Sequence, residues 1–273
     1  MTFRLIMGPC AIESEQFLID TAGQIQEQFA KRLGCSSTEV NDTLNAYGID
    51  YYFKSSFDKA NRTSINSFRG VGLITGLESL KAVNQQFGFK TLTDIHETHQ
   101  APLVGDVVDV IQIPAFLCRQ TDLIVAAAKT GKIVNIKKGQ QMPASAMKHG
   151  AQKCLDAREV VEMDDKIWLT ERGTFFGYGD VVVDMRNLIE MRKYGQVIFD
   201  ATHSVQKPGG ADGTTGGDRE MVLPLLRAAL AVGIDGAFLE THPNPPQAKS
   251  DAGSQLYLDK IPQILETIVE HTI

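Results

Sequence analysis

Short, nearly continuous apolar runs recur along the whole chain, and longer stretches with helical spacing separate them. Strands that are buried on both faces of a parallel sheet have this continuous apolar character, whereas half-exposed strands alternate between apolar and polar residues. The eight runs that predict strands are Phe3–Met7, Tyr51–Phe53, Thr91–Ile95, Val107–Ile113, Ile133–Ile136, Lys166–Leu169, Val197–Phe199 and Gly236–Leu239.

Between these runs, apolar residues return every three or four positions, which predicts amphipathic helices. Glycine follows several of these stretches, as Gly88 does, at the position where helices commonly end. The predicted helices are Glu13–Leu33, Ile74–Phe87, Asp122–Lys129, Met147–Val161, Asp184–Tyr194, Arg219–Val232 and Leu256–Val269. The polar segment Cys35–Asn45 predicts a loop that is inserted after the first helix.

Eight alternations of strand and helix in about 250 residues are typical of a (β/α)₈ TIM barrel. The chain shows no linker and no shift in composition, so residues 1–273 are expected to form a single domain. A doubly wound open sheet is the alternative. It is disfavoured because Gly76 follows Gly70-Val-Gly72 one residue too late for the dinucleotide-binding pattern.

Composition narrows the classes of partner. The chain has 273 residues and a formal charge of -6, so it lacks the basic excess that nucleic-acid binding requires. No apolar run approaches the roughly 20 residues that span a bilayer, so no membrane association is expected. The four widely spaced cysteines and the missing export signal predict reduced thiols in a cytoplasmic protein.

Polar residues that carry chemistry follow each predicted strand, where the active site of a TIM barrel lies. The last strand of such a barrel lies beside the first, so these residues would surround one mouth. They include Cys10, Lys54, Asp94, His96, Gln112, Lys137, Arg172, Asp200, His203 and Glu240.

Cations gather around the loop from Lys54 to Ser64, in which hydroxyl residues and Asn61 are interspersed. Guanidinium and ammonium groups with hydroxyl donors suit phosphate oxygens, so the mouth is expected to bind a highly anionic substrate. The alternative is that some of these cations form structural ion pairs with nearby carboxylates. The cations are Lys54, Lys59, Arg62, Lys137 and Arg172.

Four residues from three neighbouring loops could converge on a metal ion. A thiolate, an imidazole and two carboxylates suit a divalent transition metal. Each residue also has an ordinary structural explanation, and His96, His99 and His242 compete as ligands. The set is Cys10, His203, Glu240 and Asp251.

The segment Gln206–Asp218 contains five glycines and follows the seventh predicted strand. Glycine permits hinging and close approach of the backbone. The segment therefore suits a mobile active-site flap, with a phosphate-cradling loop as the alternative.

Several long motifs, in order along nearly the whole chain, resemble the 3-deoxy-D-manno-octulosonate 8-phosphate synthases. This family is also called 2-dehydro-3-deoxyphosphooctonate aldolase. The motifs are Gly8-Pro-Cys-Ala-Ile-Glu-Ser14, Phe53-Lys-Ser-Ser-Phe-Asp-Lys-Ala-Asn-Arg62, Thr93-Asp-Ile-His-Glu97, Val134-Asn-Ile-Lys-Lys-Gly139, Phe199-Asp-Ala-Thr-His-Ser-Val-Gln206 and Glu240-Thr-His-Pro.

The resemblance implies a homotetrameric barrel that condenses phosphoenolpyruvate with D-arabinose 5-phosphate for the inner-core sugar of lipopolysaccharide. It assigns phosphoenolpyruvate to Lys59, Lys137 and Arg172, with Lys54 close by. It assigns the sugar phosphate to Asn61, Arg62 and Thr63 and the sugar hydroxyls to the region of Asp94. Gln112 is also expected to bind substrate. It also implies that Arg119 reaches into a neighbouring subunit. Catalytic roles are expected for Lys59, Asp94, His203 and Cys10.

One branch of that family uses a divalent metal such as Zn, Fe or Mn, whereas the other has asparagine at the cysteine position. Cys10 therefore implies the metal-dependent branch. The nearest alternative is the sister synthase that uses erythrose 4-phosphate, which typically has Pro-Arg-Thr-Ser where this chain has Ala60-Asn-Arg-Thr-Ser64. A non-catalytic barrel that binds anions is the alternative of another class.

Overall fold

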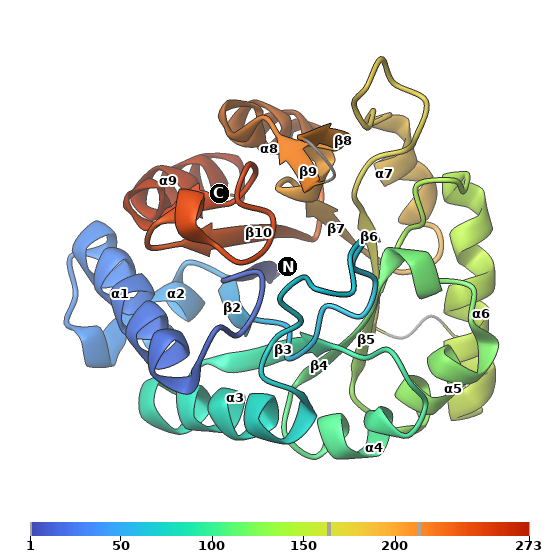
Figure 1. The fold of residues 1–273 in the computed structure, drawn as a ribbon, viewed down its shortest axis with the longest axis horizontal. Coiled ribbons are helices and arrows are strands. Elements are labelled where there is room, and N and C mark those ends of the chain that lie inside the picture. The colour runs from blue at the N-terminus through green and yellow to red at the C-terminus, as the bar shows by residue number, and fades with distance from the viewer. Residues whose placement is uncertain (1, 163–164, 212–213, 273) are drawn as a thin grey trace.

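The fold is a closed barrel of eight parallel strands surrounded by helices (Figure 1). The structure is a computed structural model, and it describes residues 2–162, 165–211 and 214–272. The barrel strands are β1 (Phe3–Gly8), β2 (Ile49–Lys54), β3 (Lys90–Asp94), β4 (Val110–Ile113), β5 (Ile133–Lys137), β6 (Ile167–Glu171), β7 (Gln196–Asp200) and β10 (Gly236–His242). This arrangement confirms the predicted TIM barrel.

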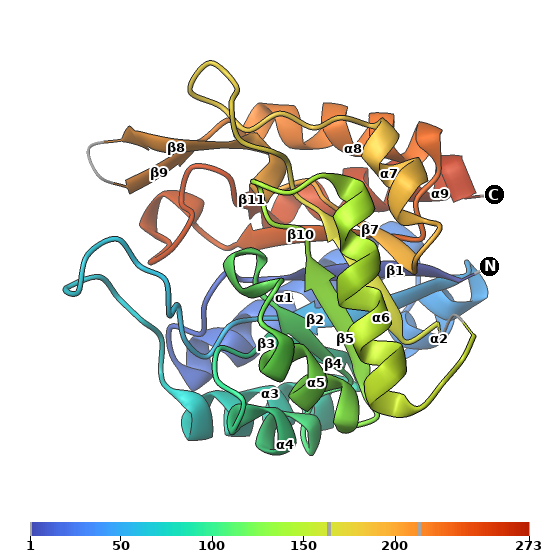
Figure 2. The same cartoon turned by 90° about the vertical axis from the view of Figure 1, so that its right-hand side faces the viewer.

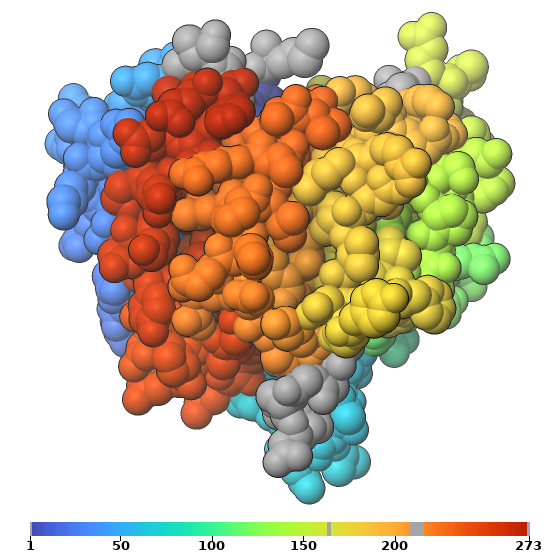
Figure 3. All heavy atoms as spheres, turned by 90° about the horizontal axis from the view of Figure 1, so that it is seen from above, coloured from blue at the N-terminus to red at the C-terminus, as the bar shows by residue number. Residues whose placement is uncertain are grey.

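Closure of the barrel joins the two ends of the chain. β10 pairs in parallel with β1, and the register places Glu240 opposite Gly8. In the outer layer, α1 (Glu15–Leu33) therefore packs beside α9 (Ile261–Thr272), which is visible as adjacent blue and red bands in Figure 3. Closure brings the loop after β1 to the loop after β10.

The remaining helices cover the barrel in chain order. They are α3 (Leu73–Phe87), α4 (Gln100–Gly105), α5 (Thr121–Lys129), α6 (Met147–Arg158), α7 (Arg186–Met191) and α8 (Val222–Val232). The short helix α4 was not predicted. Among the described residues, no helix is both long enough and apolar enough to cross a membrane.

The segment Cys35–Asn45 differs from the predicted loop. It contains a 3-10 turn (Ser37–Glu39) and most of α2 (Val40–Ala46). Ser36 and the carboxylate of Glu39 form a capping box, and Val40 and Leu44 are buried against the core. Its polar composition concealed a helix because only two of its side chains need to be apolar to anchor it.

The segment Gln206–Asp218 also has regular structure. β8 (Gln206–Ala211) pairs antiparallel with β9 (Thr214–Gly217), and residues 212 and 213 of the predicted flap lie outside the described residues. Figure 2 shows this hairpin and the loop between β2 and α3 extending from the same end of the barrel, opposite both chain termini. The predicted mobility of the segment stays a prediction.

The barrel interior is apolar at one end and polar at the other. A cluster of buried side chains fills the apolar end, and it comprises Ile6, Tyr52, Leu92, Val110, Trp168, Ile198 and Phe238. Alternate residues of a strand face the same side, so the residue two positions further along also faces the interior. On all but one of these seven strands that residue is polar, namely Lys54, Asp94, Gln112, Thr170, Asp200 and Glu240.

Candidate functional site

A cavity of about 610 Å³ opens at the carboxyl ends of the barrel strands. Its size suits ligands of the size of small metabolites. The predicted site residues that line it are Lys54, Lys59, Asn61, Arg62, Thr63, Asp94, Gln112, Lys137, Arg172, His203, Glu240 and Asp251. Barrel closure thus brings together residues from distant parts of the sequence.

Two cations lie deep in this cavity. Lys137 contacts the ring of Phe238 with Nζ 4.0 Å from the centroid, and Nζ lies 2.5 Å from Oδ2 of Asp200. The guanidinium of Arg172 donates from Nη2 to Oε1 of Gln206 at 2.5 Å, while its buried Nη1 has no hydrogen-bond partner among the described residues. Burial lowers the pKa of both groups. The free Nη1 is a donor that an anionic ligand would satisfy.

The lysines of the β2 loop differ in their surroundings. Nζ of Lys54 donates to Oε1 of Glu240 at 2.6 Å and to the carbonyl of Cys10 at 3.1 Å, so Lys54 is already paired. Nζ of Lys59 donates to Oγ of Ser56 at 3.0 Å. Burial lowers the pKa of Lys59, but the surrounding carboxylates, among them Glu240, Asp94 and Asp251, outweigh it and raise the pKa. Lys59 is therefore a cation that remains available for an anion.

The rim of the cavity holds further hydrogen-bond donors that suit a phosphate group. Asn61 and Thr63 are exposed and line the mouth. Arg62 crosses to the loop after β10, where Nη1 donates to Oγ of Ser250 and Nη2 to the carbonyl of Lys249, both at 3.0 Å. The cations thus divide into an inner group and a rim group.

Asp94 and Gln112 face the space between these groups. Nε2 of His96 lies 3.1 Å from Oδ2 of Asp94, while the buried Oδ1 of Asp94 accepts no hydrogen bond from the part of the chain that the structure describes. Burial raises the pKa of Asp94, but the hydrogen bond and charge of His96 outweigh it, so the pKa lies well below its usual range. Oε1 of Gln112 accepts from Asn135 at 3.1 Å. An ionised carboxylate with one free oxygen suits a hydroxyl donor.

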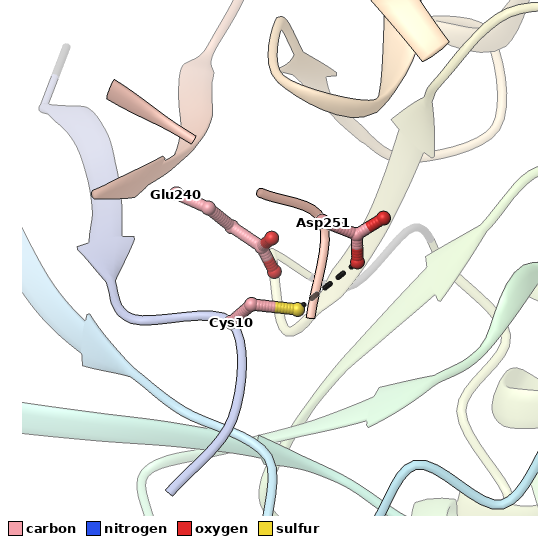
Figure 4. Close-up of side chains that lie close together, drawn as sticks. All are labelled: Cys10, Glu240 and Asp251. Atoms are coloured by element: carbon pink, nitrogen blue, oxygen red, sulfur yellow. Dashed lines mark hydrogen bonds between the residues drawn. The ribbon is translucent and has the colours of Figure 1, made fainter. Parts of the chain in front are cut away.

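Three donor atoms meet where β1 and β10 end (Figure 4). Cys10, Glu240 and Asp251 each offer one ligand atom, and these atoms lie within 4.8 Å of one another. Sγ of Cys10 donates to Oδ2 of Asp251 at 3.1 Å. Burial, together with the charge of Glu240, raises the pKa of the Cys10 thiol.

His203 turns its second nitrogen towards this group. Nδ1 lies 2.8 Å from Oδ2 of Asp200 and 3.4 Å from Nζ of Lys137, and Nε2 lies 3.7 Å from Oε2 of Glu240 and 4.0 Å from Oδ2 of Asp251. An ionised carboxylate can only accept, so a proton on Nδ1 faces Asp200, and the imidazole in its neutral form then keeps its lone pair on Nε2. This orienting role of Asp200 was not predicted, although its position two residues after Ile198 was a usable signal.

These four side chains fit a divalent transition ion. Oε2 of Glu240 is buried and receives no hydrogen bond from any described residue, and Lys54 holds only the other oxygen. The charges of Lys54 and His203 outweigh the effect of burial and lower the pKa of Glu240, which stays ionised. Sulfur, imidazole nitrogen and carboxylate oxygens together are typical ligands of zinc and its neighbours.

The competing histidines are engaged elsewhere. His96 pairs with Asp94, and His99 is exposed at the start of α4. Nε2 of His242 lies 3.3 Å from Oε1 of Glu13, and its Nδ1 accepts from the backbone of Asn244 at 2.9 Å. Arg119 is also exposed and does not line this cavity.

The barrel and its mouth define a class of protein. A ring of buried cations beside a thiol, imidazole and carboxylate set is typical of a TIM-barrel enzyme that acts on a phosphorylated or otherwise highly anionic small molecule.

Comparison with known proteins identifies the family. The family described as the DAHP synthetase I family matches residues 1–273, and the chain belongs to it. Curated proteins named 2-dehydro-3-deoxyphosphooctonate aldolase are similar over nearly the full length. The protein from Campylobacter jejuni is 51% identical over 272 residues, covering 97% of this chain and 95% of its own. The proteins from Wolinella succinogenes and Fusobacterium nucleatum are each 50% identical, covering 98% of this chain and 97% and 90% of their own.

These names confirm the resemblance noted in the sequence, because they are the alternative name of the octulosonate synthases. They favour that enzyme class over the sister synthase that uses erythrose 4-phosphate.

Proposed function

We propose that this chain condenses phosphoenolpyruvate with D-arabinose 5-phosphate and water to give 3-deoxy-D-manno-octulosonate 8-phosphate and inorganic phosphate. The proposal rests on a single cavity that combines the inner cations, the rim cations and a group of side chains suited to bind a metal ion. The name shared by relatives that are about 50% identical supports the same reaction.

The inner cations suit phosphoenolpyruvate, which carries a carboxylate and a phosphate close together. Arg172 offers its unpaired Nη1, and Lys59 is held protonated by the anions around it. Lys137 is oriented by Asp200 and points over Phe238. Lys54 is less available to the substrate, because its ammonium group already donates to Glu240 and to the carbonyl of Cys10.

The rim suits the phosphate of the aldose. Asn61, Arg62 and Thr63 offer an amide, a guanidinium and a hydroxyl at the entrance. An extended five-carbon chain anchored there would carry its aldehyde inwards past Asp94, whose free oxygen can accept a hydroxyl proton. Two anionic ends held at different depths of one cavity supply the proximity that the condensation needs.

The chemistry joins C3 of phosphoenolpyruvate to the aldehyde carbon. Positive charge develops at C2, water adds there, and the resulting tetrahedral carbon loses phosphate by cleavage of its bond to the bridging oxygen. Lys59, Lys137 and Arg172 orient the enol phosphate and stabilise the charge of the departing phosphate. The pKa of Lys59 is raised, so it serves as a fixed cation and not as a base.

Cys10, His203, Glu240 and Asp251 would hold a divalent ion such as Zn, Fe or Mn. When bound, this ion would supply Lewis acidity to the aldehyde oxygen or to the attacking water. We also propose that the enzyme is a cytoplasmic homotetramer in which Arg119, exposed in one subunit, contributes to the cavity of a neighbour. Mass determination in solution and the effect of Arg119→Ala on the affinity for arabinose 5-phosphate test this assembly.

A phosphate-release assay with each aldose tests the reaction. With phosphoenolpyruvate, Mn²⁺ and arabinose 5-phosphate, phosphate should be released and the eight-carbon product should form. Erythrose 4-phosphate should react far more slowly. Preference for erythrose 4-phosphate would assign the sister reaction, and binding of phosphoenolpyruvate without turnover of either aldose would assign a non-catalytic barrel.

A further inference from the structure

The side chain of Gln206 lies between Arg172 and Asp251, which is one of the four proposed metal ligands. Its Oε1 accepts from Nη2 of Arg172 at 2.5 Å, and its Nε2 donates to Oδ1 of Asp251 at 2.6 Å. The side chain is only 7% exposed, so water cannot easily replace either bond. No role was predicted for this residue from the sequence, because the residues it joins are 34 and 45 positions away.

The amide of Gln206 satisfies both neighbours, because its oxygen accepts and its NH₂ group donates. Arg172 can only donate, and an ionised aspartate can only accept. Oδ1 of Asp251 accepts from Gln206 and Oδ2 accepts from Ser250 and Cys10, so both oxygens act as acceptors. A carboxylate at position 206 would repel Asp251, and an ammonium group would repel Arg172.

The bond to Gln206 also decides which oxygen of Asp251 faces Cys10. Oδ1 is taken by Gln206, whereas Oδ2 accepts from Ser250 at 3.0 Å and lies 3.1 Å from Sγ of Cys10. The carboxylate therefore cannot rotate without breaking buried hydrogen bonds. This arrangement is what a metal-binding carboxylate needs in order to present one fixed oxygen.

The backbone holds Gln206 in place from both sides. Gln206 follows the 3-10 turn His203–Val205 and is the first residue of β8, where it pairs with Gly217. Its carbonyl accepts from the backbone of Val181, in the loop after β6, at 3.3 Å. The backbone of Gln206 is therefore fixed by the 3-10 turn before it, the loop after β6 and the hairpin of β8 and β9.

We propose that Gln206 is a positioning residue that couples the metal ligand Asp251 to the phosphoenolpyruvate-binding Arg172. The inference rests on the proposed function for the identity of the two ligands. Loss of the amide should weaken both binding events at once. Arg62 of the rim donates to the carbonyl of Lys249 and to Ser250, which itself donates to Asp251, so binding of the aldose phosphate should change less than the other two binding events.

Gln206→Leu is the direct test, because leucine has a similar volume and no polar atoms. Mn²⁺ binding is measured by calorimetry on the metal-free protein without substrate. The dissociation constant should rise about 10-fold or more, which is typical of losing a hydrogen bond to a ligating side chain. In the Mn²⁺-saturated protein, the KM for phosphoenolpyruvate should rise several-fold, while the KM for arabinose 5-phosphate should rise less.

Gln140→Leu is the matched control. Gln140 is buried to a similar extent and lines the same cavity, but its Oε1 has no hydrogen-bond partner among the described residues. Its substitution should leave Mn²⁺ affinity unchanged. If Gln206→Leu does not fold, as judged by circular dichroism, Gln206→Asn replaces it, since the shorter amide cannot span both neighbours.

Unchanged Mn²⁺ affinity together with an unchanged KM for phosphoenolpyruvate in a folded Gln206 variant overturns the proposal. An equal loss of Mn²⁺ affinity in Gln140→Leu also overturns it, because the effect would then be general to the cavity. Failure of the proposed reaction is a separate result. It would be seen as absent turnover in the unchanged protein, whereas the calorimetric measurement needs no turnover.

Discussion

Replacement of Asp200 by asparagine tests how the buried polar core of the site is stabilised. Asp200 is fully buried and pairs through Oδ2 with Nζ of Lys137 at 2.5 Å and with Nδ1 of His203 at 2.8 Å. Its Oδ1 also accepts from the backbone of His203 at 2.9 Å. Asparagine keeps the shape and the backbone contact but removes the charge.

The expected loss of stability is large because Lys137 would remain buried without its counter-ion. Removing one partner of a buried ion pair costs about 3–5 kcal/mol. One feature places Asp200→Asn at the lower end of that range. Burial already lowers the pKa of Lys137, so that group can lose its proton at a smaller cost. We expect the free energy of unfolding to fall by about 3 kcal/mol.

The substitution should also change the tautomer of His203. An amide NH₂ facing Nδ1 would donate to it, which moves the imidazole proton to Nε2 and blocks the lone pair that faces Glu240 and Asp251. Metal affinity should therefore fall more than stability alone explains. Calorimetry with Mn²⁺ on the folded variant measures this effect.

Urea unfolding at pH 7, followed by circular dichroism, measures the stability change. Asp184→Asn is the matched control, because Asp184 pairs with Arg186 at 2.6 Å but lies at the surface, where such pairs contribute little. The control should unfold at the same urea concentration as the unchanged protein. Equal urea midpoints for Asp200→Asn and the unchanged protein would refute the reasoning, because the buried pair would then contribute no more than the exposed one.

The remaining predictions concern the proposed metal ligands, the rim arginine, Asp94 and two glycines. Chelation should abolish activity, and added Mn²⁺, Zn²⁺ or Fe²⁺ should restore it, whereas full activity in verified metal-free protein would contradict the proposed ligand set. Cys10→Asn should lower the affinity for Mn²⁺, measured by calorimetry, by about 10-fold or more. Arg62→Ala should raise the KM for arabinose 5-phosphate about 10-fold or more and that for phosphoenolpyruvate little, and steady-state kinetics that show the reverse pattern would exchange the two subsites. The pKa of Asp94 in the folded protein lies below its ordinary value of 3.8, so its contribution to stability is full above that value and is lost as pH falls. The free energy of unfolding should decline from about pH 5 to 3, and less steeply in Asp94→Asn. Equal declines in both proteins would contradict the lowered pKa of Asp94. Gly23→Ala in α1 has room for a methyl group, with Phe87 3.7 Å away, and should raise the free energy of unfolding by about 0.5–1 kcal/mol. In Gly8→Ala the new methyl group meets the Lys54 backbone, so the urea midpoint should fall. An unchanged midpoint in the Gly8 variant would show that β1 can shift.

The accuracy of the sequence predictions depended on how local the responsible interactions are. The strands of the barrel were found because each must be apolar along its whole length, and α1 and α3 begin and end within two residues of the predicted bounds. The segment Cys35–Asn45 was wrongly expected to be a loop, because α2 is anchored by only Val40 and Leu44. The hairpin of β8 and β9 was missed because glycine-rich strands have no side-chain pattern to reveal them.

The sequence alone determined the fold class and predicted most of the polar residues that line the cavity. All strands of a TIM barrel run in parallel, so polar residues such as Lys54, Asp94 and Glu240 could be assigned to one end of the barrel from their positions after the apolar runs. The resemblance to a known family then gave most of them a role.

Only the tertiary structure decided which of these groups are free and which are already paired. Lys54 belongs to Glu240, Asp200 orients His203, and Gln206 joins Arg172 to Asp251. Such pairings depend on barrel closure, which brings Cys10 and Asp251 within 3.1 Å across 241 positions of sequence. No local pattern encodes a contact of that range, because it is fixed by the packing of the whole barrel around its core.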